Sequence, residues 1–388
     1  MNLNPLVWLQ PPFRFFFFWT GFFFSKVFLE PEDSNSCCEL NFWIPMSGSC
    51  GRLCLHDLKQ IWTILRSRSV VRVKGPDVEK FFQNLVTQDV RDIGVLTEGR
   101  HAGFLNSRGR LLHDTILSRP SEEEFLVDVD RANVDRLTRQ LNMYKLRANV
   151  KISDASNELS VWSFAGVPSA DALQVNPVTA FPDPRSEALG LRMVLEKKSR
   201  PPIPENVTGV TENVYKVIRT LNGICEGSVE SQGDFRDEEL PLECNLDVTG
   251  GVSFDKGCYI GQELTARTHH TGVVRKRFFP MAIDKSPDRA LRAAQVAQEY
   301  IDSDQKILIP QNLIDYDANY ELSGSLIERE GANRPTGELR SSVYNLSMSH
   351  IRFEQAFDDD GKSTVFNVGE QYAVAWKPSW FQRLQRVQ

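Results

Sequence analysis

The sequence predicts an α+β fold. Helical segments and antiparallel-type hairpins mix along the chain without the alternating βαβα rhythm of a parallel sheet. The chain has 388 residues, 41% of them apolar and 25% charged, which is enough for more than one domain with a sizeable core. From Phe278 onward, short strands separated by turn signals predict a separate, mostly β domain.

The first predicted elements are a strand and a helix. In residues 69–74 polar and apolar side chains alternate, which predicts a strand. Residues 77–86 place Phe81, Phe82 and Leu85 on one face and predict a helix. Hairpin strands and a second periodic helix follow. The segments predicted here are strands over 102–105, 111–117, 125–129 and 150–152, a turn over 106–109 and a helix over 131–145.

A break with three prolines, residues 197–204, separates these elements from the next group. Residues 211–221 then place Val214, Val217 and Leu221 on one face and predict a helix. Residues 226–239 are polar and predict a loop.

The net charge and the cysteine content exclude several classes of function. The formal net charge is −6, which argues against nucleic acid as a partner, because phosphate binding needs clustered Lys and Arg. The seven cysteines are odd in number and include no CxxC pair, which favours a reducing compartment. A structural zinc, or a cluster held by this chain alone, is therefore not expected.

The first 45 residues differ from the rest because they are rich in Phe. After Met46 the chain is rich in Arg and Ser and poor in acids, which is typical of a mitochondrial transit segment. We therefore expect the functional product to start at or near Met46. A membrane anchor over residues 7–29 is the alternative, although Arg14 and Lys26 would interrupt it.

The most informative stretch is 251–280. Residues 260–268 predict a helix, with Cys258 at or beside its N-terminus. There the helix dipole and Lys256 would both favour a thiolate. Gly257 and Gly261 would let a ligand or partner approach the backbone. The alternative interpretation is a buried, structural cysteine.

Within this stretch, one eight-residue run resembles the signature of the YgfZ-type branch of the glycine-cleavage T-protein superfamily. Residues 264–277 closely resemble the mitochondrial iron–sulfur assembly factors of that branch. Weaker similarities lie at 82–90, in the hairpin around 104–114, at 240–246 and at 335–338. The signature consists of Lys256, Gly257, Cys258, Tyr259, Ile260, Gly261, Gln262 and Glu263.

The resemblance implies a three-part fold around a central hole that accepts a folate, with a C-terminal β-barrel. The family's folate-binding positions correspond, by this resemblance, to Asn106, Asp114, Asn222 and Arg275. Two departures from the family pattern argue against a function as a tetrahydrofolate-dependent one-carbon transferase, because His113 and Asn222 replace expected carboxylates. The implied division is an extension over 1–45, a leader over 46–61, an aminomethyltransferase-like region over 62–277 and a barrel over 278–388.

The resemblance also implies a function in the mitochondrial matrix, the maturation of [4Fe–4S] proteins with A-type iron–sulfur carrier proteins. Cys258 would supply one thiolate to a transient cluster shared with the partner, and no turnover by this chain itself is expected. Cys225 and Cys244 are interpreted as core or loop cysteines. His269 and His270 are interpreted as surface groups, with metal ligation as the alternative. The folate-dependent transferase remains the alternative function.

Overall fold

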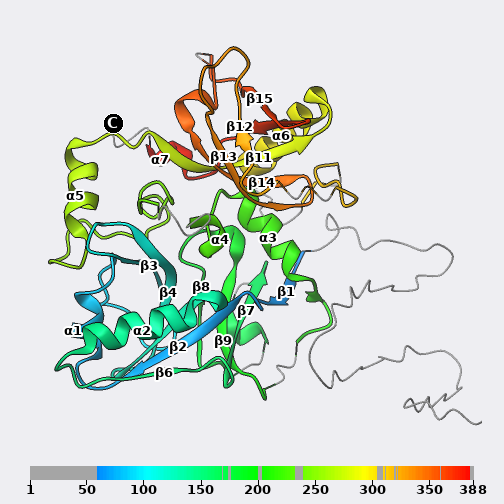
Figure 1. Cartoon of the computed structure of the whole chain (residues 1–388). Coiled ribbons are helices and arrows are strands. Elements are labelled where there is room, and N and C mark those ends of the chain that lie inside the picture. The colour runs from blue at the N-terminus through cyan, green and yellow to red at the C-terminus, as the bar shows by residue number, and fades with distance from the viewer. Residues whose placement is uncertain are drawn as a thin grey trace, which may run out of the picture. The chain divides into compact units, whose positions relative to one another are not determined.

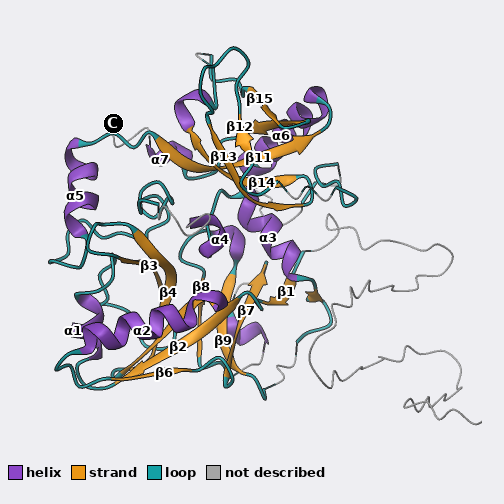
Figure 2. Ribbon diagram, in the orientation of Figure 1, coloured by secondary structure: helices purple, strands orange, loops and turns teal. Residues whose placement is uncertain are grey.

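The computed structural model describes residues 59–384, apart from 168, 174–175, 200–202, 232–238, 304–308, 311, 319, 321 and 359. The predicted extension over 1–45, and the predicted leader up to residue 58, lie outside the described residues. The described part combines three sheets with helices (Figures 1 and 2). The predicted α+β class is confirmed.

The first sheet is antiparallel, with strand order β3-β4-β5-β2-β6. Phe82 of α1 and Leu137 of α2 are fully buried in one apolar cluster with Phe104 and Phe125 of the strands. All five predicted strands of this region are present. The bounds are β2 Arg68–Lys74, α1 Val78–Gln83, β3 Gly99–Leu105, β4 Leu111–Ser121, β5 Glu124–Asp130, η2 Arg131–Asn133, α2 Val134–Lys145 and β6 Lys151–Asp154.

The second sheet has the order β10-β1-β7-β9-β8, and only its β1–β10 pair is parallel. The predicted helix over 211–221 is α3, which buries Val217 and Leu221 in the core beside this sheet. The bounds are β1 Ile61–Ile64, β7 Leu159–Ala165, η3 Ala170–Leu173, β8 Thr179–Pro182, η4 Glu187–Leu189, β9 Leu191–Glu196, β10 Thr208–Gly209 and α3 Glu212–Leu221.

The C-terminal sheet has the order β12-β13-β14-β11-β16-β15 and nearly closes into a barrel. Its two edges meet where Glu328 and Asn367 exchange backbone hydrogen bonds of 2.9 and 2.8 Å. The predicted β-barrel character of the C-terminal part is thus confirmed, but α6, which packs on β11 and β16, was not predicted. The bounds are β11 Lys276–Asp284, α6 Pro287–Asp302, β12 Leu326–Ile327, β13 Gly337–Val343, β14 Leu346–Arg352, η5 Phe353–Gln355, β15 Val365–Val368, β16 Gln371–Ala375 and α7 Phe381–Leu384.

A network of buried ion pairs ties the three sheets together. Asp128 of β5 accepts from Arg68 of β2 at 2.8 Å and from Arg192 of β9 at 2.6 Å, so it links the first two sheets. Glu230 of the short helix α4 (Ser228–Ser231) accepts from Arg219 at 2.6 Å and from Ser341 of the C-terminal sheet. Charges that are buried and paired in this way fix how the sheets meet.

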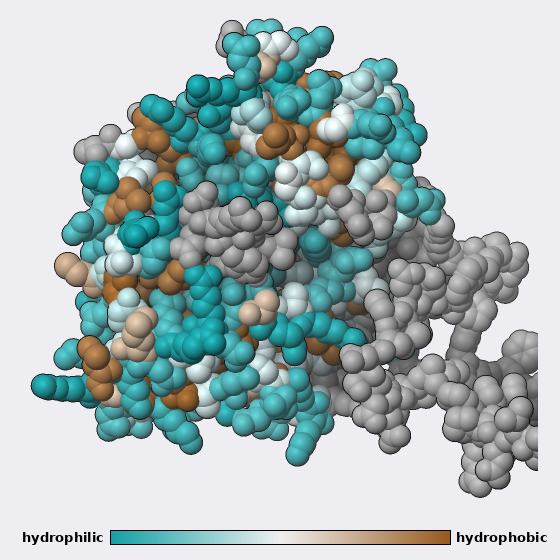
Figure 3. All heavy atoms as spheres, viewed as in Figure 1, coloured by the Kyte–Doolittle hydropathy of each residue, from teal (hydrophilic) through white to brown (hydrophobic). Residues whose placement is uncertain are grey.

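The surface of the described part carries apolar side chains in small, separate groups on the face shown in Figure 3. Such scattered apolar residues are normal for a globular chain. Within residues 59–384, leaving out the gaps, no helix has the length and hydropathy needed to cross a membrane. The alternative anchor over 7–29 lies outside the described residues.

Candidate functional site

Cys258 is exposed and lies in the irregular segment that precedes helix α5 in the chain. Helix α5 is Gln262–Thr271, so it begins two residues later than predicted. Gly261 precedes it in the left-handed conformation, with a φ of 79°. Cys258 was predicted at or beside the helix N-terminus; it precedes the first residue of α5 by four positions, outside the first turn in which the helix dipole acts.

Two buried neighbours hold the segment that carries Cys258. The ammonium group of Lys256 donates to the carbonyl oxygens of Val86 and Gln88, both at 2.8 Å. It also lies 5.2 Å from the ring centroid of Tyr259, which is itself buried. Burial lowers the pKa of Lys256 to about 8. Lys256 thus fastens the loop to the segment after α1, and its charge is directed at carbonyls rather than outward beside the thiol.

The two signature glycines have different roles. A Cβ on Gly261 would lie 2.4 Å from the carbonyl oxygen of Asn106 and 3.0 Å from the Cα of Gly109, in the turn of the β3–β4 hairpin. Gly261 therefore serves packing inside the protein, and it does not leave space for a ligand as predicted. A Cβ on Gly257 would meet nothing within 4 Å, so this glycine lies open beside Cys258.

Cys225 and Cys244 lie in the core, as interpreted from the sequence, in the same apolar cluster as Tyr259. Burial raises the pKa of both thiols. Of the three cysteines that the structure describes, Cys258 is the exposed one. The alternative interpretation of Cys258 as a buried structural residue is thus wrong.

The remaining signature residues begin α5. The backbone N–H of Gln262 donates to the carbonyl of Tyr259 at 3.3 Å, and Glu263 is exposed in the first turn. At the other end of the helix, the ring of His269 stacks on Phe254 with centroids 3.6 Å apart, while His270 is exposed. These contacts give α5 a side-chain anchor at its C-terminal end.

The four predicted folate-binding residues occupy different settings. Asn106 shapes the hairpin turn, since its side-chain oxygen accepts from the backbone of Arg108 at 2.8 Å. Asp114 is buried and accepts from Arg68 at 3.2 Å, and burial raises its pKa. Arg275 is exposed just before β11.

Asn222 caps α3, where its side-chain amide donates to the carbonyl of Ile218 at 2.8 Å. It also lines a cavity of about 180 Å³, together with Arg185, Tyr300 and Trp380. None of the other three predicted residues lines this cavity. Of the four predicted folate positions, Asn222 is therefore the one that lines this cavity.

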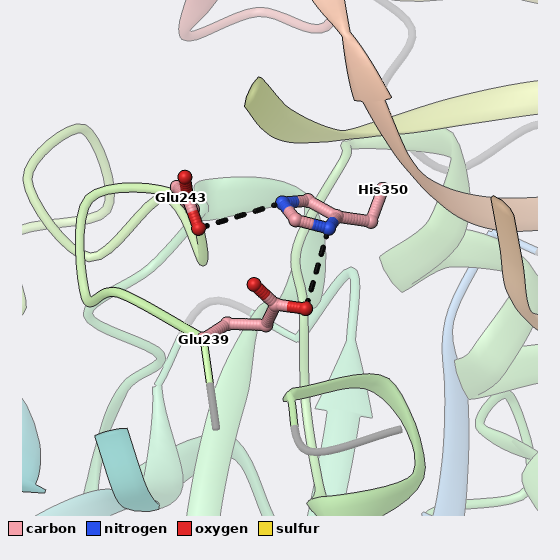
Figure 4. Close-up of side chains that lie close together, drawn as sticks. All are labelled: Glu239, Glu243 and His350. Atoms are coloured by element: carbon pink, nitrogen blue, oxygen red, sulfur yellow. Dashed lines mark ion pairs between the residues drawn. The ribbon is translucent and has the colours of Figure 1, made fainter. Parts of the chain in front are cut away.

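A cluster that the sequence analysis missed consists of Glu239, Glu243 and His350 (Figure 4). Burial lowers the pKa of His350 to about 3, and burial together with the contact to Glu243 raises the pKa of Glu239 to about 7. The spacing of the two glutamates offered a weak local signal. Only the pairing of the strands in the C-terminal sheet brings His350 to them.

The chain resembles known proteins along most of the described part. The GCVT N-terminal domain family matches residues 66–182. A glycine cleavage system aminomethyltransferase T from Bartonella henselae shares the fold, with a TM-score of 0.57, 12% identity, and coverage of 84% of this chain and 88% of that one. This likeness confirms the T-protein-like architecture.

Among the relatives are proteins named mitochondrial iron–sulfur cluster assembly factor IBA57 or mitochondrial IBA57 homolog. The Mycosarcoma maydis protein is 33% identical over 82% of this chain and 84% of its own length. The Mus musculus protein is 37% identical over 58% and 67%, respectively. The Pyricularia oryzae protein is 41% identical, but the match spans only 57% of each chain. With its T-protein-like fold and these matches, the chain belongs to the IBA57 family.

Proposed function

We propose that this chain is a mitochondrial iron–sulfur cluster assembly factor that acts in the matrix on [4Fe–4S] proteins. Cys258 supplies one thiolate to a cluster shared with an A-type carrier protein. The exposed thiol of Cys258, on a loop held from both sides by buried residues, is the observation that carries the proposal. The names of the relatives support the same class of function.

Chemistry supports a shared rather than a self-held cluster. Thiolates suit iron and sulfide, but a cluster needs several such ligands. Among the described residues, no group of three or more His, Cys, Asp or Glu ligand atoms includes Cys258. The other ligands are therefore expected from the partner.

The loop supports transfer because it is already ordered. Lys256 ties one end of the loop to the segment after α1, and Gly261 packs the other end on the β3–β4 hairpin turn, so the thiol needs no folding step before it meets a partner. Preorganisation of this kind lowers the entropy cost of association. Gly257 leaves the backbone beside the thiol uncovered, which lets a partner approach closely.

Folate chemistry has less support from the described residues. Asp114 is already bound by Arg68, and of the four predicted folate positions Asn222 alone lines the cavity of about 180 Å³. Turnover of an aminomethyl donor with tetrahydrofolate by the purified chain would restore the transferase alternative.

The test uses cells depleted of this protein and rescued with the full chain, either intact or carrying Cys258→Ala. Aconitase reports on [4Fe–4S] maturation, and a [2Fe–2S] protein measured beside it reports on earlier steps. We expect depletion to lower only aconitase activity, and the intact chain but not Cys258→Ala to restore it.

Cys225→Ala is the matched control, because it removes a buried thiol and should still support rescue at equal protein level. Full rescue by Cys258→Ala would remove Cys258 from the function. Normal aconitase activity after depletion would remove the proposed function itself.

A further inference from the structure

Glu239, Glu243 and His350 bring three potential ligand atoms together outside the signature loop. One such atom from each residue lies within 4.8 Å of the other two. The Nδ1 of His350 lies 3.3 Å from a carboxylate oxygen of Glu239, and its Nε2 lies 3.7 Å from one of Glu243 (Figure 4). The cluster joins the segment before Cys244 to β14 of the C-terminal sheet.

The imidazole of His350 is oriented as a metal ligand would be. Its side chain is only 4% exposed, and Nε2 has no hydrogen-bond partner among the residues that the structure describes. With the proton on Nδ1, facing Glu239, the lone pair of Nε2 is directed to the side of Glu243 (Figure 4). One oxygen of Glu239 faces Nδ1, which leaves its second oxygen as the candidate ligand. The ring is also fixed by stacking on Phe278, with centroids 5.0 Å apart.

Two cations, Arg340 and Lys276, act on the cluster, and three carboxylates, those of Glu239, Glu243 and Glu338, lie in or beside it, which leaves a negative balance. Arg340 pairs with one oxygen of Glu239, but it also pairs with Glu338 at 2.7 Å, so its charge is shared. The second oxygen of Glu239 is turned to the side of Glu243 (Figure 4). Two carboxylates in contact repel one another unless a cation or a proton lies between them.

We infer that Glu239, Glu243 and His350 bind a divalent first-row metal ion at a site distinct from Cys258. One imidazole and two carboxylates suit Mn²⁺, Fe²⁺ or Zn²⁺. Two ligands each about 2.1 Å from one ion lie about 3.4 Å apart at a tetrahedral angle, close to the spacing of Nε2 and the Glu243 oxygen. The ion ties the 239–243 segment to β14. This inference does not depend on the proposed function.

The test titrates Mn²⁺ into the purified full chain and follows the electron paramagnetic resonance signal of the free ion. Mn²⁺ is the probe because thiols bind it poorly, so the cysteines should not contribute. We expect one bound equivalent in the intact chain. Glu243→Gln and His350→Gln should each weaken binding at least about tenfold, since even supporting residues of a metal site contribute this much.

Two controls separate a lost ligand from a damaged fold. His113→Gln alters another buried histidine and should keep the bound equivalent, as should Cys258→Ser. Glu243→Gln preserves the shape of a half-buried side chain, and thermal unfolding without metal checks that it folds. No Mn²⁺ bound by the intact chain, or binding by Glu243→Gln and His350→Gln as tight as that of the intact chain, would overturn the inference.

Discussion

Two regions of the molecule use ionisable side chains in opposite ways. At the junction of the sheets, Asp128 and its arginine partners are buried and paired, so their charges serve only the fold. In the signature loop, Lys256 is buried and paired, but Cys258 beside it is left exposed. The difference teaches that buried charge fixes the scaffold, whereas the group free to react is the one that the scaffold presents to solvent.

The largest effect is expected at the junction. The guanidinium of Arg192 lies 2.6 Å from a carboxylate oxygen of Asp128 and 3.2 Å from one of Asp183. Arg192→Met would remove this partner from both buried carboxylates. Removing one partner of a buried pair costs about 3–5 kcal/mol. Urea unfolding followed by circular dichroism measures the loss. Arg91→Met, which breaks the exposed pair with Asp89, is the control and should barely move the midpoint.

The next effect concerns the close contact behind the signature loop. Gly261→Ala places a Cβ 2.4 Å from the carbonyl oxygen of Asn106 and forces a left-handed alanine, so we expect a loss of about 1–3 kcal/mol. Gly257→Ala meets open space and should change the free energy of unfolding by less than about 0.5 kcal/mol. Equal losses in the two variants would show that the contact with the hairpin turn is unimportant.

Lys256 links the two regions, because it is a buried charge within the functional loop. Lys256→Met leaves the carbonyls of Val86 and Gln88 without their donor, and we expect a loss of about 1–3 kcal/mol. Burial lowers the pKa of Lys256 from 10.5 to about 8, so between these values the folded chain binds fewer protons than the unfolded chain. The intact chain should therefore gain stability, relative to the variant, as pH rises from 8 to 10.

Paired urea titrations of the intact chain and Lys256→Met at pH 7.5 and pH 10 measure this difference. If the difference in the free energy of unfolding between the intact chain and Lys256→Met shrinks at pH 10, the lowered pKa of Lys256 in the folded chain would be contradicted.

The smallest effect on stability is expected at Cys258 itself. Cys258→Ser should change the free energy of unfolding by less than about 0.5 kcal/mol, because the side chain is exposed. Of the three cysteines in the described part of the native chain, iodoacetamide should modify Cys258 first, whereas Cys225 and Cys244 should react only on unfolding. Peptide mapping after timed alkylation measures the order. Early modification of Cys244 would show that its pocket opens.

Sequence periodicity was sufficient for elements with one buried face, such as α3 and the hairpin strands. It failed for β7, which buries almost every residue and so shows no alternation, and for α6, whose buried face is mostly alanine. In both cases the local apolar pattern lacked the contrast on which such a prediction depends.

The site was predictable only in part. The signature run identified Cys258, but the left-handed turn at Gly261 delays α5 and separates the thiol from the helix end. Neither the buried role of Lys256 nor the cluster around His350 was visible, because both depend on segments far apart in the sequence.

The most direct test of the central claim follows the alkylation rate of Cys258 in the purified chain, alone and with a cluster-loaded A-type carrier. If Cys258 ligates the shared cluster, the loaded carrier should slow its modification and the cluster-free carrier should not. Equal rates in the presence of loaded and cluster-free carrier would contradict a thiolate ligand at Cys258.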